Sequence, residues 1–310
     1  VCSEWVTFVD PDDFVDLDYF SQIDSYIYKN IAKKMSMVSC NFIFYIEDKG
    51  TYSNTHPLNF RFKDGEKIIP ILQMDNNLRL HVNSVFFRKD IIIENNILFD
   101  DRIKPNFEDG HFVSNYMAAD PKGFIAFCSK AKYFYRKRSD GSSSLDTSWE
   151  KVGKYTDVLE YGYLSLLEKF ASMGEIPKSI QWTILYDLIW HFKRLVQHPE
   201  RVNILDESQK EKYISLINEI FEYIDVKQII DFNLGGAWFY HKVGMFGLFK
   251  KQSQSFQIVY AEQFDFAKNQ ILLRYFSNAK DIEKITIDGR DVIPDFSKTV
   301  LHDFVGQKFC

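Results

Sequence analysis

The hydrophobic positions in the first half of the chain follow the periods of alternating strands and helices. Residues 4–9 (EWVTFV) are β-branched and aromatic and end at an acidic turn, as expected of a buried strand. Apolar residues spaced three and four apart then predict an amphipathic helix over residues 17–31. Further strands are predicted at residues 41–46, 85–89, 123–127 and 131–136, a hairpin-type turn at 64–65, a stretch leading into a loop at 91–99, and a helix at 107–116.

The second half of the chain has a different pattern. Long apolar stripes at helical spacing predict helices over residues 158–170, 180–196 and 213–224. From about residue 256 strands return, and residues 285–292 alternate around an Asp-Gly pair that indicates a β-hairpin. We therefore predict an α/β fold over residues 1–147, a helical region over 148–255, and the start of a β-rich module over 256–310.

Composition narrows the class of protein. The net charge is −5, so no general attraction to nucleic acid is expected. The four cysteines, Cys2, Cys40, Cys128 and Cys310, are scattered without zinc spacing and are typical of reduced thiols. No apolar run approaches the ~18 residues that a membrane span needs, and no signal peptide opens the chain. We expect a cytoplasmic protein, with peripheral contact at the inner face of the membrane as an open alternative.

The two ends predict a piece of a longer protein. Val1 is followed at once by the approach to a buried strand, and Cys310 closes a pattern that is still strand-like.

The first group that could carry chemistry is the acidic turn Asp10-Pro11-Asp12-Asp13. Crowded carboxylates repel each other, and they are stable together with a cation or with generous solvent and backbone donors. Their oxygens suit Mg²⁺ or Mn²⁺, which also bind diphosphates and neutralise a departing nucleotide. The alternative is an acidic turn that caps the following helix.

Two other groups have similar ambiguity. Glu108-Asp109 stands at a predicted helix start, where a carboxylate acts as a cap or, if it faces a cleft, as a general base. Residues 135–138 (YRKR) and Ser142 suit phosphate oxygens, because arginine forks and hydroxyls bind them well; the alternative is a solvated basic strand end. His111, one turn into the helix, is interpreted as structural.

The order of the three groups is more specific than each alone. A DxDD-type motif after a strand (FVDPDDFVD, residues 8–16), an ED motif on a helix (NFEDGHF, 106–112) and a Y-x-R-x-R…S segment (YFYRKRSDGSSS, 133–144) resemble the family 2 glycosyltransferases with the GT-A fold. The resemblance covers about residues 1–145. It implies a partial GT-A, Rossmann-like core from which the N-terminal, base-binding part is absent.

For the donor, the resemblance implies a nucleotide sugar, with UDP-sugar the expected class. Asp12 would contact the metal, Mn²⁺ or Mg²⁺, and Asp10 would face the nucleotide sugar. Arg136, Arg138 and Ser142 would hold the diphosphate.

For the acceptor, the resemblance implies that Asp109 is the general base that deprotonates a hydroxyl group, with Glu108 flanking it. Transfer would be a single displacement with inversion. The helices beyond residue 150 give the chain a vaguer similarity to bacterial enzymes that build teichoic acid or capsule, so the expected acceptor is a glycan or polyol phosphate. Residues 238–251, aromatic and basic, are a packing helix or a membrane-surface segment, and the helical region is a candidate oligomer interface.

Two other functions stay open at this point. A glycosidase would also use two carboxylates and aromatic side chains, but it needs no metal or phosphate ligands. A scaffold or oligomerisation piece of a larger cell-envelope enzyme would need no catalytic residue at all.

Overall fold

The computed structural model describes residues 3–138, 147–254, 256–277 and 283–310. The chain forms two compact units. The first consists of Val1–Leu188 with Ile204–Gly235, and the second of Ile189–Asn203 with Gly236–Cys310. The predicted Ser142 lies outside the described residues.

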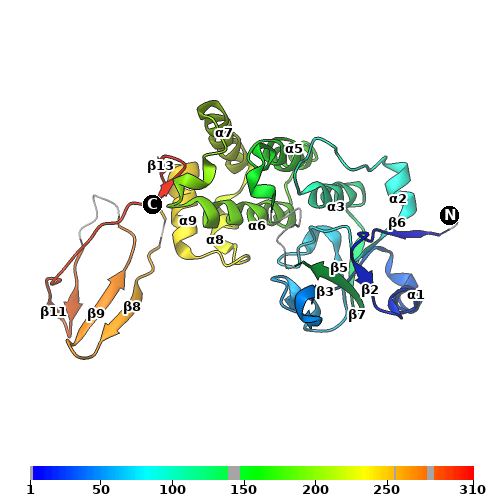
Figure 1. The fold of residues 1–310 in the computed structure, drawn as a ribbon, viewed down its shortest axis with the longest axis horizontal. Coiled ribbons are helices and arrows are strands. Elements are labelled where there is room, and N and C mark those ends of the chain that lie inside the picture. The colour runs from blue at the N-terminus through cyan, green and yellow to red at the C-terminus, as the bar shows by residue number, and fades with distance from the viewer. Residues whose placement is uncertain (1–2, 139–146, 255, 278–282) are drawn as a thin grey trace. The chain divides into compact units, whose positions relative to one another are not determined.

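The first unit is built on a seven-stranded mixed sheet (Figure 1). The strand order is β1-β6-β3-β7-β2, with β4 beside β3 and β5 beside β7. β3 and β7 are parallel, and the other pairs are antiparallel. This mixed sheet with helices confirms the predicted α/β class. The strands are β1 (Trp5–Thr7), β2 (Phe14–Val15), β3 (Met35–Ile46), β4 (Thr51–Ser53), β5 (Lys67–Pro70), β6 (Val85–Arg88) and β7 (Phe124–Lys137).

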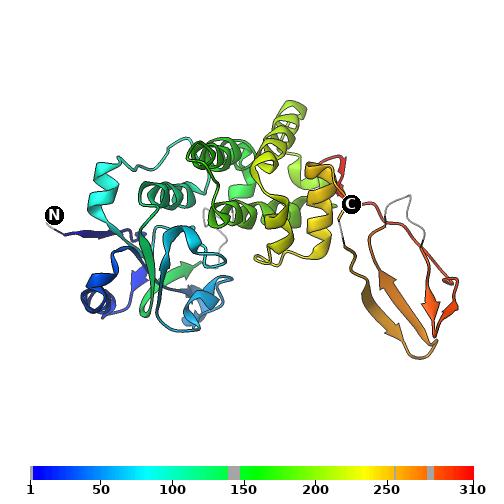
Figure 2. The same cartoon turned by 180° about the vertical axis from the view of Figure 1, so that it is seen from behind.

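Two consecutive residues of β6 show how the sheet is covered on both faces. Side chains alternate along a strand, so Phe86 and Phe87 point to opposite sides. Phe86 meets Tyr19 of α1 (Tyr19–Lys29), with ring centroids 5.6 Å apart. Phe87 meets Phe112 of α3 (Glu108–Ala119), also at 5.6 Å. Helices α1 and α3 therefore lie on different sides of the sheet, as Figures 1 and 2 show.

The predicted apolar stripes of the helical region are buried. Ile180, Ile184 and Leu188 of α6 are fully covered, as are Tyr213 and Ile217 of α7. α7 begins with a reciprocal cap between Asp206 and Gln209, which satisfies two backbone donors at the helix start. The helices here are a π-helical segment (Val158–Leu164), α5 (Ser165–Ser172), α6 (Lys178–Leu195), α7 (Glu207–Tyr223) and α8 (Val226–Asp231).

The second unit has a small aromatic core beneath α9 (Phe239–Gly244) and a π-helical segment (Met245–Lys250). Gly244 is required there, because an added Cβ would lie 2.2 Å from the Phe309 ring. The predicted hairpin around Asp288-Gly289 is confirmed, since both residues have positive φ, at 49° and 77°. The strand pairs are β8 (Tyr260–Asp265) with β9 (Gln270–Arg274), β10 (Thr286–Ile287) with β11 (Arg290–Asp291), and β12 (Asp303–Phe304) with β13 (Gln307–Lys308).

Three local predictions were wrong. Residues 89–94 form a short helix, α2 (Lys89–Glu94), which is too brief for a 3.6-residue period to be recognised. The strands predicted at 123–127 and 131–136 are one strand, β7, in which an irregularity moves the pairing partner from Cys128 to Lys132. The Asp64-Gly65 turn follows a 3₁₀-helix and leads into β5, which pairs with β7 and not with a hairpin partner.

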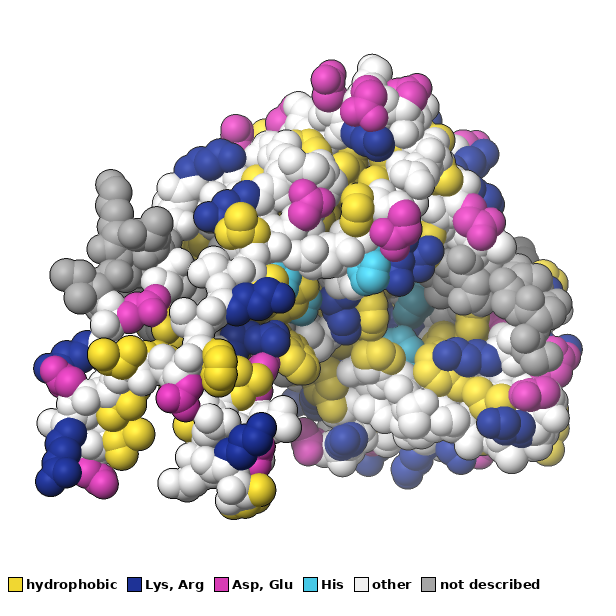
Figure 3. Space-filling view, turned by 60° about the vertical axis from the view of Figure 1, so that its left-hand side comes forward, with side chains coloured by type: hydrophobic (Ala, Val, Ile, Leu, Met, Phe, Trp, Pro, Cys, Tyr) yellow, Lys and Arg dark blue, Asp and Glu magenta, His cyan; other side chains and the backbone are white. Residues whose placement is uncertain are grey.

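Two surface properties complete the description. Among the residues that the structure describes, no helix is both long and apolar enough to cross a membrane. On the face drawn in Figure 3, acidic and basic side chains are interspersed, in keeping with the small net charge.

Candidate active site

The acidic turn connects β1 and β2, which belong to the same sheet. Phe8, just after β1, forms a parallel bridge to Asn83, and its ring packs edge-on against Phe112 at 5.6 Å. The N–H of Asp13 donates to the carbonyl of Asp10 at 3.1 Å, which closes the turn. The chain then enters β2, which pairs with β7. Both ends of the turn are thus fixed by the sheet.

The three carboxylates of this turn have different partners. Asp13 accepts from the Tyr133 hydroxyl at 2.7 Å and from the Arg136 N–H at 2.9 Å, so it fastens the turn to β7. Burial raises the pKa of Asp13, while these two donors oppose the rise. Asp12 forms an ion pair with Arg138 at 2.7 Å, and Asp10 accepts from the side-chain amide of Asn83 at 2.9 Å. Asp13 therefore has two donors from β7, whereas the side chains of Asp10 and Asp12 have one partner each.

Asp109 lies in the first turn of α3 and faces the same region. The backbone N–H of Val82 donates to its carboxylate at 3.1 Å. Burial raises the pKa of Asp109 to about 7, the negative charges of Glu108 and Asp10 act in the same direction, and the Val82 donor and Arg79 oppose them. A carboxyl with this pKa is near the optimum for a general base at neutral pH.

Glu108 stands beside Asp109 without a fixed role in the fold. Its Oε2 atom is buried and has no hydrogen-bond partner among the described residues. Burial raises the pKa of Glu108, and the charge of Asp10 adds to the effect. The preceding residue, Phe107, has a left-handed backbone (φ 81°) and packs its ring edge-on against Tyr163 at 4.6 Å. This packing sets the start of α3 and thereby the direction of both carboxylates.

The Asp10 and Asp109 carboxylates both accept hydrogen bonds from residues that the sequence did not predict for the site. Val82 contacts Asp109 and the next residue, Asn83, contacts Asp10. Asp10 and Asp109 are thus brought to one place by adjacent residues of a single turn before β6. A signal was present: the polar Asn83 and Ser84 directly precede the apolar run of β6, and both are buried.

The predicted diphosphate ligands are partly engaged with other groups. Arg136 forms an ion pair with Glu47 at 3.2 Å, while Arg138 is bound to Asp12. Both lie at the end of β7 that adjoins the acidic turn. Arg138 therefore contacts Asp12, the carboxylate that is predicted to bind the metal.

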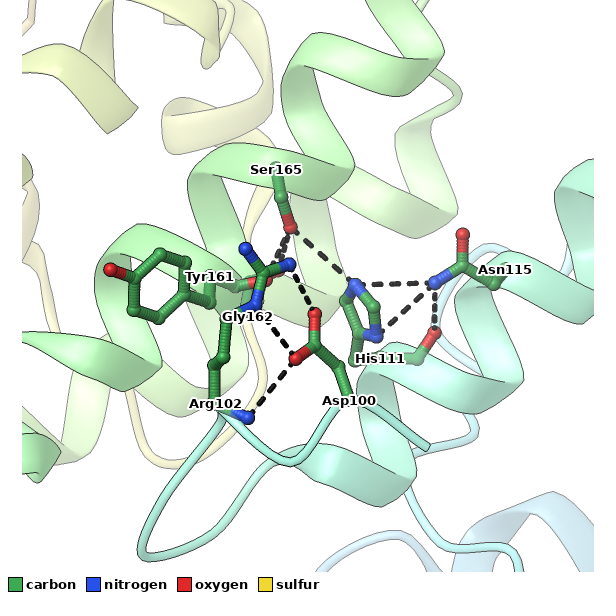
Figure 4. Close-up of polar contacts among 7 residues, drawn as sticks. All are labelled: Asp100, Arg102, His111, Asn115, Tyr161, Gly162 and Ser165. Carbon is green, nitrogen blue, oxygen red and sulfur yellow. Dashed lines mark hydrogen bonds and ion pairs between the residues drawn. The ribbon is translucent and has the colours of Figure 1, made fainter. Parts of the chain in front are cut away.

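His111 belongs to a separate polar cluster on α3. Figure 4 shows its imidazole between Asn115, 3.2 Å away, and the Ser165 hydroxyl, 3.4 Å away. Burial lowers the pKa of His111 to about 4, so the ring is neutral at physiological pH. The cluster borders a pocket of about 350 Å³ lined also by Lys169 and residues 95–101.

The predicted metal has a partial set of ligands. Among the described residues, no three carboxylate, histidine or cysteine side chains gather into a site that would hold an ion by themselves. Asp10 and Asp12 nevertheless supply hard oxygen atoms on one turn, which suit Mg²⁺ or Mn²⁺ when a diphosphate provides the remaining ligands. A metal ion at this turn stays a prediction, for which Asp10 and Asp12 are the oxygen ligands on offer.

Comparisons with known proteins find relatives at low sequence identity. No protein-family model matches the chain. It is homologous to two proteins of Bacillus subtilis (strain 168), the minor teichoic acid biosynthesis proteins GgaA and GgaB. GgaA is 24% identical over 266 residues, which are 84% of this chain and 56% of GgaA. GgaB is 28% identical over 228 residues, which are 73% of this chain and 24% of GgaB.

Solved structures give the fold. The crystal structure of S. aureus TarS 1-349 in complex with UDP-GlcNAc matches 90% of this chain and 76% of its own, with a TM-score of 0.55 and 13% identity. That of S. aureus TarS matches 75% of this chain and 36% of its own, with a TM-score of 0.51 and 12% identity. The predicted resemblance to bacterial teichoic-acid enzymes is confirmed. The chain spans about half of GgaA and a quarter of GgaB.

Proposed function

We propose that the chain carries the catalytic residues of an inverting, metal-assisted glycosyltransferase of teichoic-acid biosynthesis. The observation that supports this most strongly is the meeting of Asp10 and Asp109 on the turn formed by Val82 and Asn83. A carboxylate able to face a nucleotide sugar and a carboxyl with a pKa near 7 are then held by two adjacent residues. The homology to GgaA and GgaB and the fold of TarS support the same class.

In the proposed reaction, Asp109 removes the proton from an acceptor hydroxyl as the hydroxyl oxygen bonds to the anomeric carbon of the donor sugar. The bond from that carbon to the diphosphate breaks, and the nucleoside diphosphate leaves with the electron pair. Arg136, Arg138 and Ser142 would hold the diphosphate, and Asp12 would ligate Mn²⁺ or Mg²⁺, which neutralises the departing charge. Most of the rate would come from positioning and charge stabilisation.

For the substrates, we propose a UDP-sugar as donor and a hydroxyl group of a glycan or polyol phosphate as acceptor. The class of donor is supported by the TarS structure, which is described as a complex with UDP-GlcNAc. We also propose that the protein works in the cytoplasm, where it would meet its acceptor at the inner face of the membrane, and that its helical region supplies any oligomer contact.

A binding experiment tests the donor site. UDP should raise the melting temperature of the protein in the presence of Mn²⁺, and EDTA should abolish the rise. Asp12→Ala should remove it, whereas Asp16→Ala, a change to a carboxylate of the same segment that pairs with Lys132, should retain it. An equal shift in both variants would contradict the assignment of Asp12.

A turnover experiment tests the base. Asp109→Asn should lower the transfer rate at least about a hundredfold, because the acceptor proton then has no base, and UDP binding should persist. Full turnover by this variant would exclude Asp109 as the base. Sugar release without a metal requirement would favour a glycosidase instead.

A further inference from the structure

Arg79 is a buried arginine that the proposed mechanism does not use. Its side chain is 1% exposed, and among the described residues no carboxylate forms an ion pair with it. Burying a guanidinium without a counter-ion is costly. Its Nε and Nη1 atoms have no hydrogen-bond partner among the described residues, so the hydrogen bonds of Nη2 are what offset the loss of hydration. Those bonds show what the residue stabilises.

The guanidinium binds the turn that holds the two site carboxylates. Its Nη2 atom donates to the carbonyl of Asn83 at 2.7 Å and also to the Ser84 hydroxyl. Ser84 has a φ of +56°, in the left-handed region that disfavours residues with a side chain. Arg79 thus stabilises a strained backbone from inside the core.

The strained backbone at Ser84 follows directly on the two groups that donate hydrogen bonds to the site carboxylates. With Ser84 in this conformation, the Val82 N–H points to Asp109 and the Asn83 amide points to Asp10. If the turn relaxed, both hydrogen bonds would change together, because the two donors belong to adjacent residues.

We infer that Arg79 is a positioning residue for sugar transfer: by fixing the turn at residues 82–84, it sets Asp10 and Asp109 at the correct separation for donor and acceptor to meet. The inference rests on the proposed function, in which these two carboxylates serve opposite substrates. Arg79 itself need touch neither substrate.

The positive charge of Arg79 has a second effect on the same site. Glu108 and Asp10 face Asp109 and favour its protonated form, whereas Arg79 and the Val82 N–H favour the carboxylate. Arg79 therefore acts in two separable ways. Its Nη2 atom holds the turn, and its charge keeps more of Asp109 ionised.

Arg61 provides a matched control. It is also 1% exposed and lies in the same unit. It donates from Nε to the Leu58 carbonyl at 2.8 Å and from Nη1 to the Leu78 carbonyl, and it makes no hydrogen bond to residues 82–84 among the contacts described. Substitution at either arginine should cost similar stability, but only substitution at Arg79 should disturb the carboxylates.

The test compares four variants of the whole chain at a temperature below all their melting points. Arg79→Lys keeps the charge and removes the Nη2 donor from the Asn83 carbonyl and the Ser84 hydroxyl. We therefore expect kcat to fall about tenfold or more and donor KM to rise relative to Arg61→Lys. Arg79→Gln removes the charge as well, so the midpoint of the pH–rate profile should move to higher pH, while Arg61→Gln should leave it unchanged. If the Gln variant does not fold, the Lys pair alone decides.

A second measurement separates this inference from the proposed function. Carbon NMR titration of the Asp109 carboxyl, assigned with Asp109→Asn, reports its midpoint without any turnover. A higher midpoint in Arg79→Gln but not in Arg61→Gln would support the role of Arg79 even if no sugar donor were used. Equal midpoints and equal rates in the Arg79 and Arg61 variants would overturn the inference.

Discussion

The side-chain amide of Asn83 donates to the Asp10 carboxylate at 2.9 Å, although the two residues are 73 positions apart. The bond is made possible by the parallel bridge between Phe8 and Asn83, which brings the end of β1 beside the start of β6. Asn83 is buried, and its side-chain amide fixes the orientation of the Asp10 carboxylate. The contact is therefore the starting point for testing the donor site.

Asn83→Ala should weaken UDP binding in the presence of Mn²⁺ about tenfold. A hydrogen bond to a charged group contributes roughly 1.5–3 kcal/mol, and its loss leaves the Asp10 carboxylate free to rotate. Isothermal titration calorimetry would measure the effect. Asn77→Ala, which removes a contact to Lys67 outside the site, should bind UDP as the parent does. Similar affinity in both variants would show that Asp10 does not need this partner.

Asp109→Asn should stabilise the fold at alkaline pH. The pKa of Asp109 is about 7 in the folded protein against an ordinary value of 3.8, so the native state binds an extra proton between these pH values. The stabilisation from the protonated carboxyl is complete below about pH 4 and is lost as the pH rises through 7. The free energy of unfolding of the variant, relative to the parent, should therefore increase from pH 5 to pH 8, by at most about 3 kcal/mol.

Urea unfolding at several pH values would measure this trend. Asp24→Asn, a change to an exposed residue of α1, is the control for the loss of one carboxylate. A constant difference between Asp109→Asn and the parent would mean that the Asp109 carboxyl titrates normally.

Tyr133→Phe should destabilise the acidic turn. The Tyr133 hydroxyl accepts from the Asp10 N–H at 3.2 Å and donates to Asp13 at 2.7 Å, so its removal leaves two groups unpaired. We expect a loss of about 1–3 kcal/mol in the free energy of unfolding, together with weaker UDP binding. Tyr52→Phe, at an exposed ring of β4, is the control for chemical denaturation. An unchanged stability would show that water replaces the hydroxyl.

Gly110→Ala should impair catalysis from within the helix. An added Cβ would lie 2.8 Å from the Phe107 ring, so that ring and the start of α3 must shift, and the adjacent Asp109 would move with them. Overpacking of this kind costs about 1–3 kcal/mol, although alanine is the better helix former. The melting temperature and kcat should both fall. Gly247→Ala, where the Phe309 carbonyl oxygen would lie 3.7 Å from the added Cβ, should change neither by a comparable amount.

Much of the fold follows from local patterns. The three-and-four spacing located α1, α6 and α7, and the Asp288-Gly289 pair located a hairpin, because both signals depend on neighbours within a few residues. Continuous strands were harder to predict. β7 reads as two strands, because the irregularity between its halves depends on pairing with β3, which is distant in the sequence.

The sequence by itself determined the types of chemical group at the candidate site, since Asp10, Asp12, Asp109 and the two arginines occur in a recognisable order. Only the tertiary structure assigned their different environments. Asp13 became an anchor because Tyr133 faces it across the sheet, and Asp109 acquired a raised pKa because burial removes water. The turn at residues 82–84 and the buried Arg79 beneath it have no local signature, because their roles arise from contacts between segments far apart along the chain.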